Sequence, residues 1–157
     1  MMSNKKGDNP GIKLPPPVIF LSFFLIAVAL KLFIPLVGIV APVRQIIAAV
    51  LVAVGFSIIT LALLRFREHR TTVLPDASAS SMIKDGIFAR TRNPIYLAFA
   101  LLYVASAFYF QVVWAFLLFP FLFAAIKMYA IRREEAYLER RFGREYLEYK
   151  GNVRRWL

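Results

Sequence analysis

The chain has 157 residues, of which 60% are hydrophobic and only 18% are charged. Soluble domains average about 45–50% apolar and about 25% charged residues. A soluble domain of this length could not bury so much apolar surface, so the composition predicts an integral membrane protein. The net charge of +11 would also suit a nucleic-acid-binding protein, and its distribution along the chain separates the two interpretations.

Eighteen of the twenty lysines and arginines lie before the first apolar run, between the second and third runs, or at the end of the chain. Only Lys31 and Arg44 lie elsewhere. Cytoplasmic segments of membrane proteins carry such an excess of basic residues. The alternation predicts a multi-pass protein of the inner (cytoplasmic) membrane with both termini in the cytoplasm. We therefore expect membrane lipids as partners and no nucleic acid.

The chain contains no cysteine and one histidine, His69, in a charged connection. These counts exclude disulfides, cysteine nucleophiles and metal sites built from thiolates or histidine clusters. We expect no metal site, and we expect His69 to be a solvated loop residue. Chemistry in this chain must use carboxylates, guanidiniums, amides, aromatic rings or a bound organic cofactor.

The polar residues 1–14 are expected to be flexible, and residues 15–157 to form a single domain. The first apolar run, 18–40, follows three prolines. A basic start also precedes it, as one precedes the apolar segment of a signal peptide. It is long for a signal peptide, and further apolar runs follow it. We therefore expect the run to be a membrane span.

Three more apolar runs follow, at 43–64, 94–110 and 112–131. A helix rises about 1.5 Å per residue, so about 20 residues cross a hydrocarbon core of about 30 Å. The run 43–64 is long enough to do so, and 94–110 is shorter. Because only Gln111 separates the last two runs, we expect them to form a helical hairpin. The predicted fold is an all-α integral membrane protein with about four transmembrane helices.

The chain after the fourth run is charged, but apolar and aromatic residues recur in it at helical spacing, at Leu138, Phe142, Tyr146 and Tyr149. This pattern predicts an amphipathic helix along the inner membrane interface, with a break near Gly143. Tyrosine and arginine side chains suit that depth.

Glu134 and Glu135 follow the fourth run directly. A carboxylate at membrane depth is costly, so it pairs with a basic group or marks a functional site. Arg132 lies one turn before Glu135 and offers a local ion pair. Glu134 has only apolar and aromatic neighbours one turn away, so its partner must come from elsewhere in the fold or from a ligand.

The Asn93-Pro94 pair is a plain helix-start signal when taken by itself, because the residue before proline avoids the helix and proline suits its first turn. This start places Asn93 and Tyr96 at the helix N-terminus, where free backbone N–H groups attract an anion. We predict that both residues line a site with Arg92 close by. Arg90 lies outside that turn and is expected to be a topological anchor.

Two blocks of the sequence become specific when they are taken together. Together they resemble the isoprenylcysteine carboxyl methyltransferase family and its phospholipid methyltransferase relatives. The first block is GIFARTRNPIY, and the second, which follows a helical hairpin, is REEAYLERRFGREYLEYK. The resemblance covers about residues 71–157. The residues that carry it are Gly86, Phe88, Arg92, Asn93, Pro94, Tyr96, Glu134, Glu135, Leu138, Phe142, Gly143, Tyr146 and Tyr149.

The resemblance implies a membrane methyltransferase that binds S-adenosyl-L-methionine at the cytosolic face. A carboxylate can pair with the cofactor's ammonium, and aromatic rings can flank its sulfonium. The cofactor-binding residues implied by position are Ser81, Met82, Ile83, Gly86, Phe88, Asn93, Pro94, Ile95, Tyr96 and Glu134.

The resemblance also implies a lipophilic, membrane-embedded acceptor. Methyl transfer to a carboxylate acceptor needs alignment and desolvation and no general base. Arg92, Arg132 or Arg133 would face an acceptor carboxylate, and Glu135 or Tyr96 would take a proton from a neutral acceptor. Of these, Arg92, Arg132 and Glu135 are the catalytic candidates. Eukaryotic members have an arginine at the position of Ala130. The resemblance therefore does not imply that prenylcysteine is the acceptor of this chain.

Two other functions remain open at this point. Membrane sterol reductases share a similar C-terminal hairpin and bind NADPH, although they are longer. A membrane protein can also keep this fold without any enzymatic activity. The sequence leaves the oligomeric state open.

Overall fold

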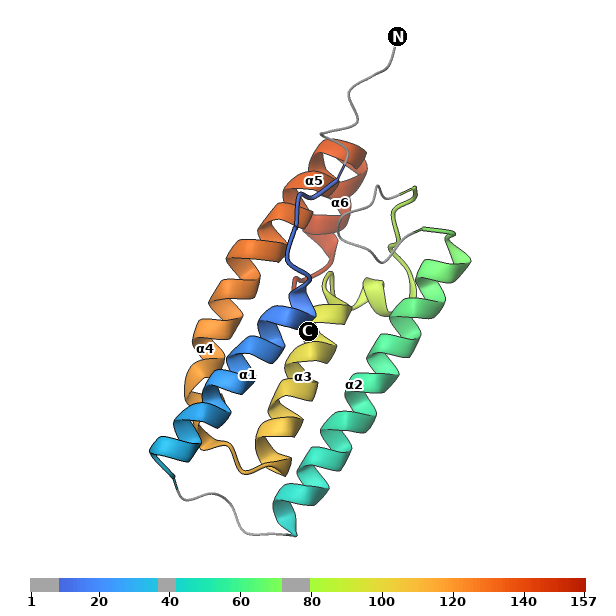
Figure 1. Cartoon of the computed structure of the whole chain (residues 1–157). Coiled ribbons are helices and arrows are strands. Elements are labelled where there is room, and N and C mark those ends of the chain that lie inside the picture. The colour runs from blue at the N-terminus through green and yellow to red at the C-terminus, as the bar shows by residue number, and fades with distance from the viewer. Residues whose placement is uncertain (1–8, 37–41, 72–79) are drawn as a thin grey trace.

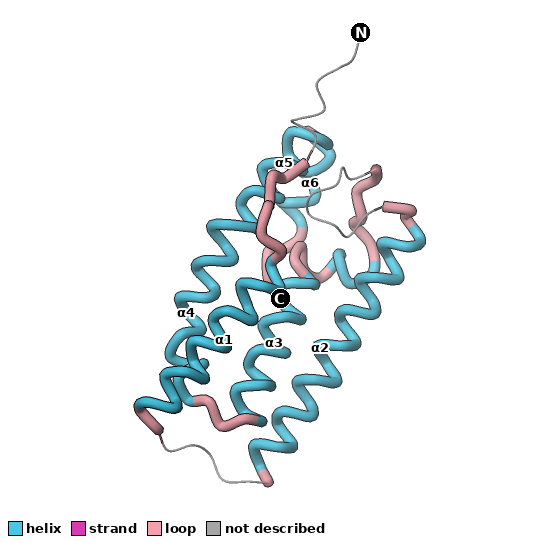
Figure 2. Tube along the Cα trace, in the orientation of Figure 1, coloured by secondary structure: helices cyan, strands magenta, loops and turns pink. Residues whose placement is uncertain are grey.

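The structure, a computed structural model, describes residues 9–36, 42–71 and 80–157. The described part of the chain is helical throughout, with turns and loops between the helices (Figure 2). The elements in chain order are α1 (Pro16–Phe33), α2 (Val43–Glu68), the short 3-10 helix η2 (Gly86–Ala89), α3 (Pro94–Tyr109), α4 (Val113–Ile126), the π-helical segment η3 (Lys127–Ile131), α5 (Arg132–Phe142) and α6 (Arg144–Asn152).

The four apolar helices run side by side and alternate in direction, as Figure 1 shows. Helix α1 contacts both α3 and α4, whereas α2 packs mainly on α3. Helices α5 and α6 gather at the end of the bundle where α1 and α3 begin. Charged and polar segments are thereby collected at one end of an otherwise apolar bundle.

Among the residues that the structure describes, three helices are long and apolar enough to cross a membrane: α1, α2 and a continuous helix over Val113–Phe142. The fourth apolar helix, α3, has 16 residues, which span about 24 Å at about 1.5 Å per residue. Large apolar side chains such as Phe33 and Phe121 point outward, where lipid would cover them. The all-α membrane fold is confirmed, with one helix shorter than the others.

Two helix boundaries differ from the sequence-based expectation. Helix α1 ends at Phe33, well before residue 40, because Pro35 follows and the residue before a proline avoids the helical conformation. Helix α2 continues one turn beyond residue 64, to Glu68. Its last turn contains arginines, which are good helix formers and can reach from the helix end into water.

The charged C-terminal segment also differs from the single amphipathic helix that we expected. Helix α5 continues α4 through η3, so that one long helix leaves the bundle. Such π-helical segments are rare and occur frequently at functional sites. The expected break is confirmed at Gly143, whose φ of +53° favours glycine, and α6 begins directly after it.

Residues 9–14, part of the N-terminus that we expected to be flexible, pack against the helices. Ile12 is only 3% exposed and belongs to the main hydrophobic core. The backbone N–H of Leu14 donates to the Tyr129 hydroxyl at 2.8 Å, and Arg133 Nη1 donates to the Gly11 carbonyl at 3.2 Å. Residues 1–8 lie outside the described part of the chain.

The two basic residues at the opposite end of the bundle have a local role. Lys31 Nζ donates to the Phe110 carbonyl at 2.7 Å, and Arg44 Nη1 donates to the Tyr109 carbonyl. These carbonyls end α3, where backbone acceptors lack helical partners and a positive charge is favourable. Lys31 and Arg44 therefore stabilise a helix end.

Membrane orientation remains a prediction, and the absence of native cysteine allows a clean test. We expect the α5–α6 end to face the cytoplasm, because the basic residues of the described chain other than Lys31 and Arg44 lie in segments that belong to that side. In intact cells, a membrane-impermeant maleimide should label a Leu36→Cys variant and not a Leu157→Cys variant. Labelling of Leu157→Cys would reverse the orientation.

Candidate functional site

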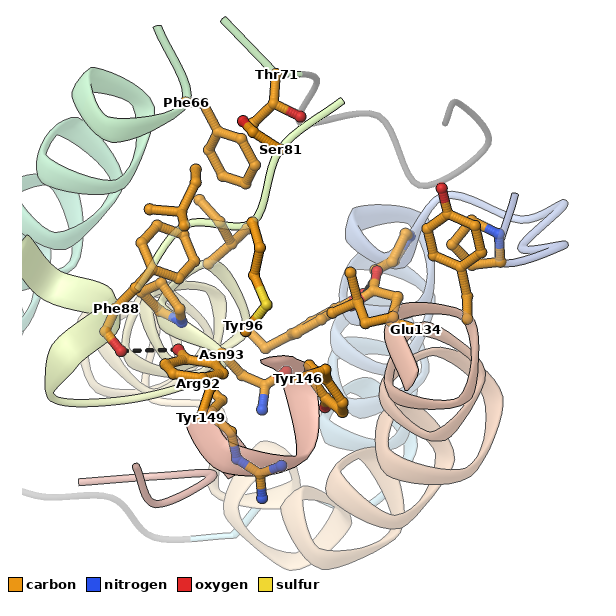
Figure 3. A pocket seen from close by; sticks show the side chains of 18 of the residues that line it. Phe66, Thr71, Ser81, Phe88, Arg92, Asn93, Tyr96, Glu134, Tyr146 and Tyr149 are labelled. Carbon is orange, nitrogen blue, oxygen red and sulfur yellow. Dashed lines mark hydrogen bonds between the residues drawn. The ribbon is translucent and has the colours of Figure 1, made fainter. Parts of the chain in front are cut away.

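A cavity of about 390 Å³ lies at the charged end of the bundle. Figure 3 shows side chains from several elements surrounding it. Its volume lies within the range of about 300–1,000 Å³ that small-molecule sites occupy. The lining residues are Pro10 and Pro15–Pro17 near the start of the described chain, Phe66 and Thr71 at the end of α2, Ser81, Met82, Ile83 and Phe88 in the connection, Arg92, Asn93, Pro94, Ile95, Tyr96 and Phe99 at the start of α3, Glu134, Tyr137 and Leu138 on α5, and Tyr146 and Tyr149 on α6.

The cavity brings together all of the predicted cofactor-binding residues except Gly86. Among the three catalytic candidates, Arg92 lines the cavity, whereas Arg132 and Glu135 do not. Arg90 is exposed and also lies outside the lining. These placements agree with the expected separation of Arg90 from Asn93 and Tyr96.

Glu134 and Tyr96 meet across the cavity wall. The Tyr96 hydroxyl donates a hydrogen bond to Glu134 Oε1 at 2.6 Å, joining α3 to α5. Within the described ranges, no lysine or arginine lies within ion-pair distance of Glu134. The partner of Glu134 from elsewhere in the fold is thus the neutral phenol of Tyr96. The Glu134 carboxylate can therefore still pair with a cation.

Asn93 directly precedes α3, as predicted. Pro94 occupies the first helical turn, and the Leu97 N–H donates to the Asn93 carbonyl at 3.0 Å. The Asn93 N–H donates to Thr91 Oγ1 at 3.2 Å, and its side-chain amide donates to the Arg155 carbonyl at 3.3 Å. Asn93 is only 7% exposed, so these contacts fix it at the cavity edge.

Gly86 shapes the connection without contacting the cavity. Its φ is +57°, and a Cβ atom there would lie 2.6 Å from Arg65 Nε. The adjacent Asp85 pairs with His69 at 3.0 Å and with Arg65 at 3.3 Å. His69 therefore pairs with the connection between α2 and α3. The expectation that it is simply a solvated loop residue is corrected.

Glu135 has different partners from those expected. Arg155 binds it with two hydrogen bonds, Nε to Oε1 at 2.8 Å and Nη2 to Oε2 at 2.7 Å. Arg92 Nη1 lies 3.3 Å from Oε1. Arg132 is exposed, and the local ion pair predicted from its spacing is not among the contacts of Glu135 in the described chain. Neither Glu135 nor Arg132 lines the cavity, and a catalytic role for either stays a prediction.

Two aromatic residues of α6 complete the cavity. The Tyr149 hydroxyl donates to the Phe88 carbonyl at 2.7 Å (Figure 3). Burial raises the pKa of Tyr149, so the hydroxyl keeps the proton that it donates. Tyr146 is 1% exposed. Sequence reasoning placed both tyrosines on a membrane-facing helix surface, because helical spacing indicates a buried face without showing what covers it.

Several lining residues were not identified from the sequence. Phe66, Thr71, Phe99 and Tyr137 carry no local signal, since apolar and aromatic residues occur throughout this chain. Pro15, Pro16 and Pro17 were noted only as preceding the first apolar run. Among the residues that the structure describes, no group of three or more histidines or acidic residues could hold a metal ion.

Comparison with known proteins identifies the family. The sequence model of the phospholipid methyltransferase family matches residues 43–145. An uncharacterized protein of Haemophilus influenzae is 59% identical over 32 residues, which are 20% of this chain and 51% of that protein. The match thus spans about half the length of that curated relative, and no solved structure matches the chain. Because the family match covers well over half of its length, the chain belongs to the phospholipid methyltransferase family.

Proposed function

We propose that this membrane methyltransferase uses S-adenosyl-L-methionine and methylates a lipophilic acceptor that reaches the cavity from the membrane. The observation that carries the proposal is Glu134. Its carboxylate lines the cavity, accepts a hydrogen bond from Tyr96 and has no basic partner within the described ranges. A desolvated carboxylate without a cation is costly, so a cationic ligand would stabilise the site.

The lining suits this cofactor in size and chemistry. The volume of about 390 Å³ is adequate for a ligand of this class. Aromatic rings of Phe88, Tyr96 and Tyr146 surround the space, and such rings attract cations such as a sulfonium. When bound, the cofactor supplies an electrophilic methyl group on a positively charged sulfur.

The residues of the chain would divide the work of binding. Glu134 would hold the ammonium group through a charge-assisted hydrogen bond. The N-terminus of α3, where Ile95 and Tyr96 have no helical partner for their N–H groups, would bind the carboxylate. Asn93 adds its side-chain amide at the same edge of the cavity.

A groove between α1 and α3 supports a lipophilic acceptor. It has a volume of about 170 Å³ and shares Pro17 and Phe99 with the cavity. The hydroxyls that line it are already engaged, Tyr103 with the Ala115 carbonyl and Ser106 with the Leu102 carbonyl. The groove therefore offers mainly apolar surface to an alkyl or prenyl chain.

An acceptor oxygen that is already ionised fits the cavity better than a neutral amine. Glu134 is the one carboxylate among the described lining residues, and in this proposal it is engaged with the cofactor. Glu134 would then have little capacity to take a proton from the acceptor. Transfer to a carboxylate would instead depend on alignment and on exclusion of water.

An NADPH-dependent reductase is the alternative that the cavity supports less well. NADPH carries phosphates, which proteins usually bind with arginine, lysine or glycine-rich loops. Arg92 is the one basic residue among the described lining residues. It lies 3.3 Å from Glu135, whose negative charge offsets its own, so a single compensated arginine faces the phosphates.

The test is a comparison of two ligands on purified protein. We expect S-adenosylhomocysteine to raise the melting temperature and NADPH to leave it unchanged, because a ligand that binds only the folded state stabilises it. At a hundredfold excess over Kd the gain is about 2.7 kcal/mol. A lipid extract incubated with the methyl-labelled cofactor would then identify the acceptor. Stabilisation by NADPH alone would favour the reductase, and no response to either ligand would contradict the proposed cofactor.

A further inference from the structure

The C-terminal tail, residues 153–157, lies beyond the family match and returns to the start of α3 (Figure 1). Three hydrogen bonds join the tail to the residues ahead of Pro94. The Arg92 N–H donates to the Arg154 carbonyl at 3.0 Å. The Arg155 carbonyl accepts from Thr91 Oγ1 at 3.0 Å and from the Asn93 amide at 3.3 Å.

The side chain of Arg155 extends the same connection to α5. It binds both oxygens of Glu135, which neighbours Glu134. A bidentate guanidinium–carboxylate pair fixes distance and orientation together. The hydrogen bonds that Arg155 donates to Glu135 raise the pKa of Arg155, in agreement with a strong pair. The ring of Trp156 lies 4.9 Å from that of Phe123, which attaches the tail to α4.

Arg155 thus links the two elements that carry the facing residues of the cavity wall. Its carbonyl holds the segment that leads to Asn93 and Tyr96, and its side chain holds the helix that carries Glu134. Glu135 has a second cation nearby in Arg92, whose Nε and Nη1 make no hydrogen bond in the described structure. Without Arg155, the Glu135 carboxylate would be drawn toward Arg92, and α5 would shift against α3.

We propose that Arg155 is a positioning residue of this site, which sets the spacing between Glu134 and the start of α3 through Glu135 and Asn93. This inference rests on the proposed function, because the spacing is assessed by the affinity for S-adenosylhomocysteine. It assigns a role in binding to a tail that the family match does not include.

The test measures S-adenosylhomocysteine affinity by calorimetry, well below the melting temperature of each variant of the full chain. Arg155→Met is expected to weaken binding by about tenfold, which corresponds to about 1.4 kcal/mol. Arg155→Lys keeps the charge and one hydrogen bond and should recover most of the affinity. The double variant Glu135→Gln with Arg155→Met should bind no more weakly than Arg155→Met, because no carboxylate remains to be drawn to Arg92.

Two controls separate positioning from general stability. Arg144→Met removes an arginine from an exposed pair with Glu148, at 3.2 Å, and should change neither affinity nor stability measurably. Trp114→Phe removes the hydrogen bond to the Ile34 carbonyl at the far end of the bundle. It should lower the melting temperature and keep the affinity.

Unchanged affinity in Arg155→Met would overturn the inference, as would an equal loss in Trp114→Phe or a failure of Arg155→Lys to recover binding. A double variant that binds more weakly than Arg155→Met would also overturn it. If the unaltered protein does not bind S-adenosylhomocysteine, the proposed function fails first and this inference falls with it.

Discussion

Replacing Glu134 with glutamine is expected to weaken S-adenosylmethionine binding strongly while the protein stays folded. Glutamine keeps the size of the side chain and can still accept the hydrogen bond from Tyr96, but it removes the charge. A hydrogen bond to a charged group contributes about 1.5–3 kcal/mol, roughly ten- to hundredfold in affinity. Calorimetric titration in detergent measures the change directly.

Glu139 offers a matched control for that experiment. It is an exposed carboxylate on the same helix and pairs with Lys150 at 3.4 Å. Glu139→Gln should bind the cofactor as the unaltered protein does, since exposed pairs contribute little. If Glu134→Gln also keeps its affinity and lowers only the melting temperature, the Tyr96–Glu134 contact is a structural link and the cofactor lies elsewhere.

The second large effect concerns the start of α3. Asn93→Ala and Tyr96→Ala are each expected to abolish measurable cofactor binding, whereas Arg90→Ala should retain it. Asn93 and Tyr96 are buried in the cavity wall, and Arg90 is exposed outside it. Alanine at position 96 also removes an aromatic wall, which adds to the loss of the hydrogen bond with Glu134. Binding and expression level are measured together for each variant.

Tyr96→Phe refines this comparison, because it keeps the ring and removes the hydroxyl alone. A single hydrogen bond contributes about 0.5–1.5 kcal/mol, so a loss of roughly two- to tenfold is expected. Loss of binding in Arg90→Ala, with binding kept in Asn93→Ala and Tyr96→Ala, would show that the polar cluster before α3 is organised differently from the structure.

Features that depend on a few neighbouring residues were predicted correctly from the sequence. Pro94 starts a helix because its fixed φ suits the first turn, and Gly143 ends one because it accepts a positive φ. The turn at Gln111 between α3 and α4 was also expected from its polarity within an apolar stretch. Such signals act over one or two turns, so they can be interpreted without knowing the fold.

Contacts between distant parts of the chain could not be predicted in the same way. The partners of Asn93 and Glu134 lie 62 and 38 residues away, at Arg155 and Tyr96. Pro10 and Pro15 precede α1 and line the cavity, and nothing in their local sequence relates them to α5. Hydrophobic packing of the bundle brings these segments together, and packing depends on the whole chain.

The two adjacent glutamates separate these contributions most clearly. The sequence by itself determined that two carboxylates follow an apolar run and that Glu134 lacks a local basic partner. It also determined the membrane helices, because their length and apolar character are properties of single segments. Successive residues on a helix point about 100° apart, since a turn takes 3.6 residues, so Glu134 and Glu135 face different surroundings. The tertiary structure alone decided that Glu134 faces the cavity and Glu135 faces Arg155, because packing against α3 and the C-terminal tail sets the rotation of α5.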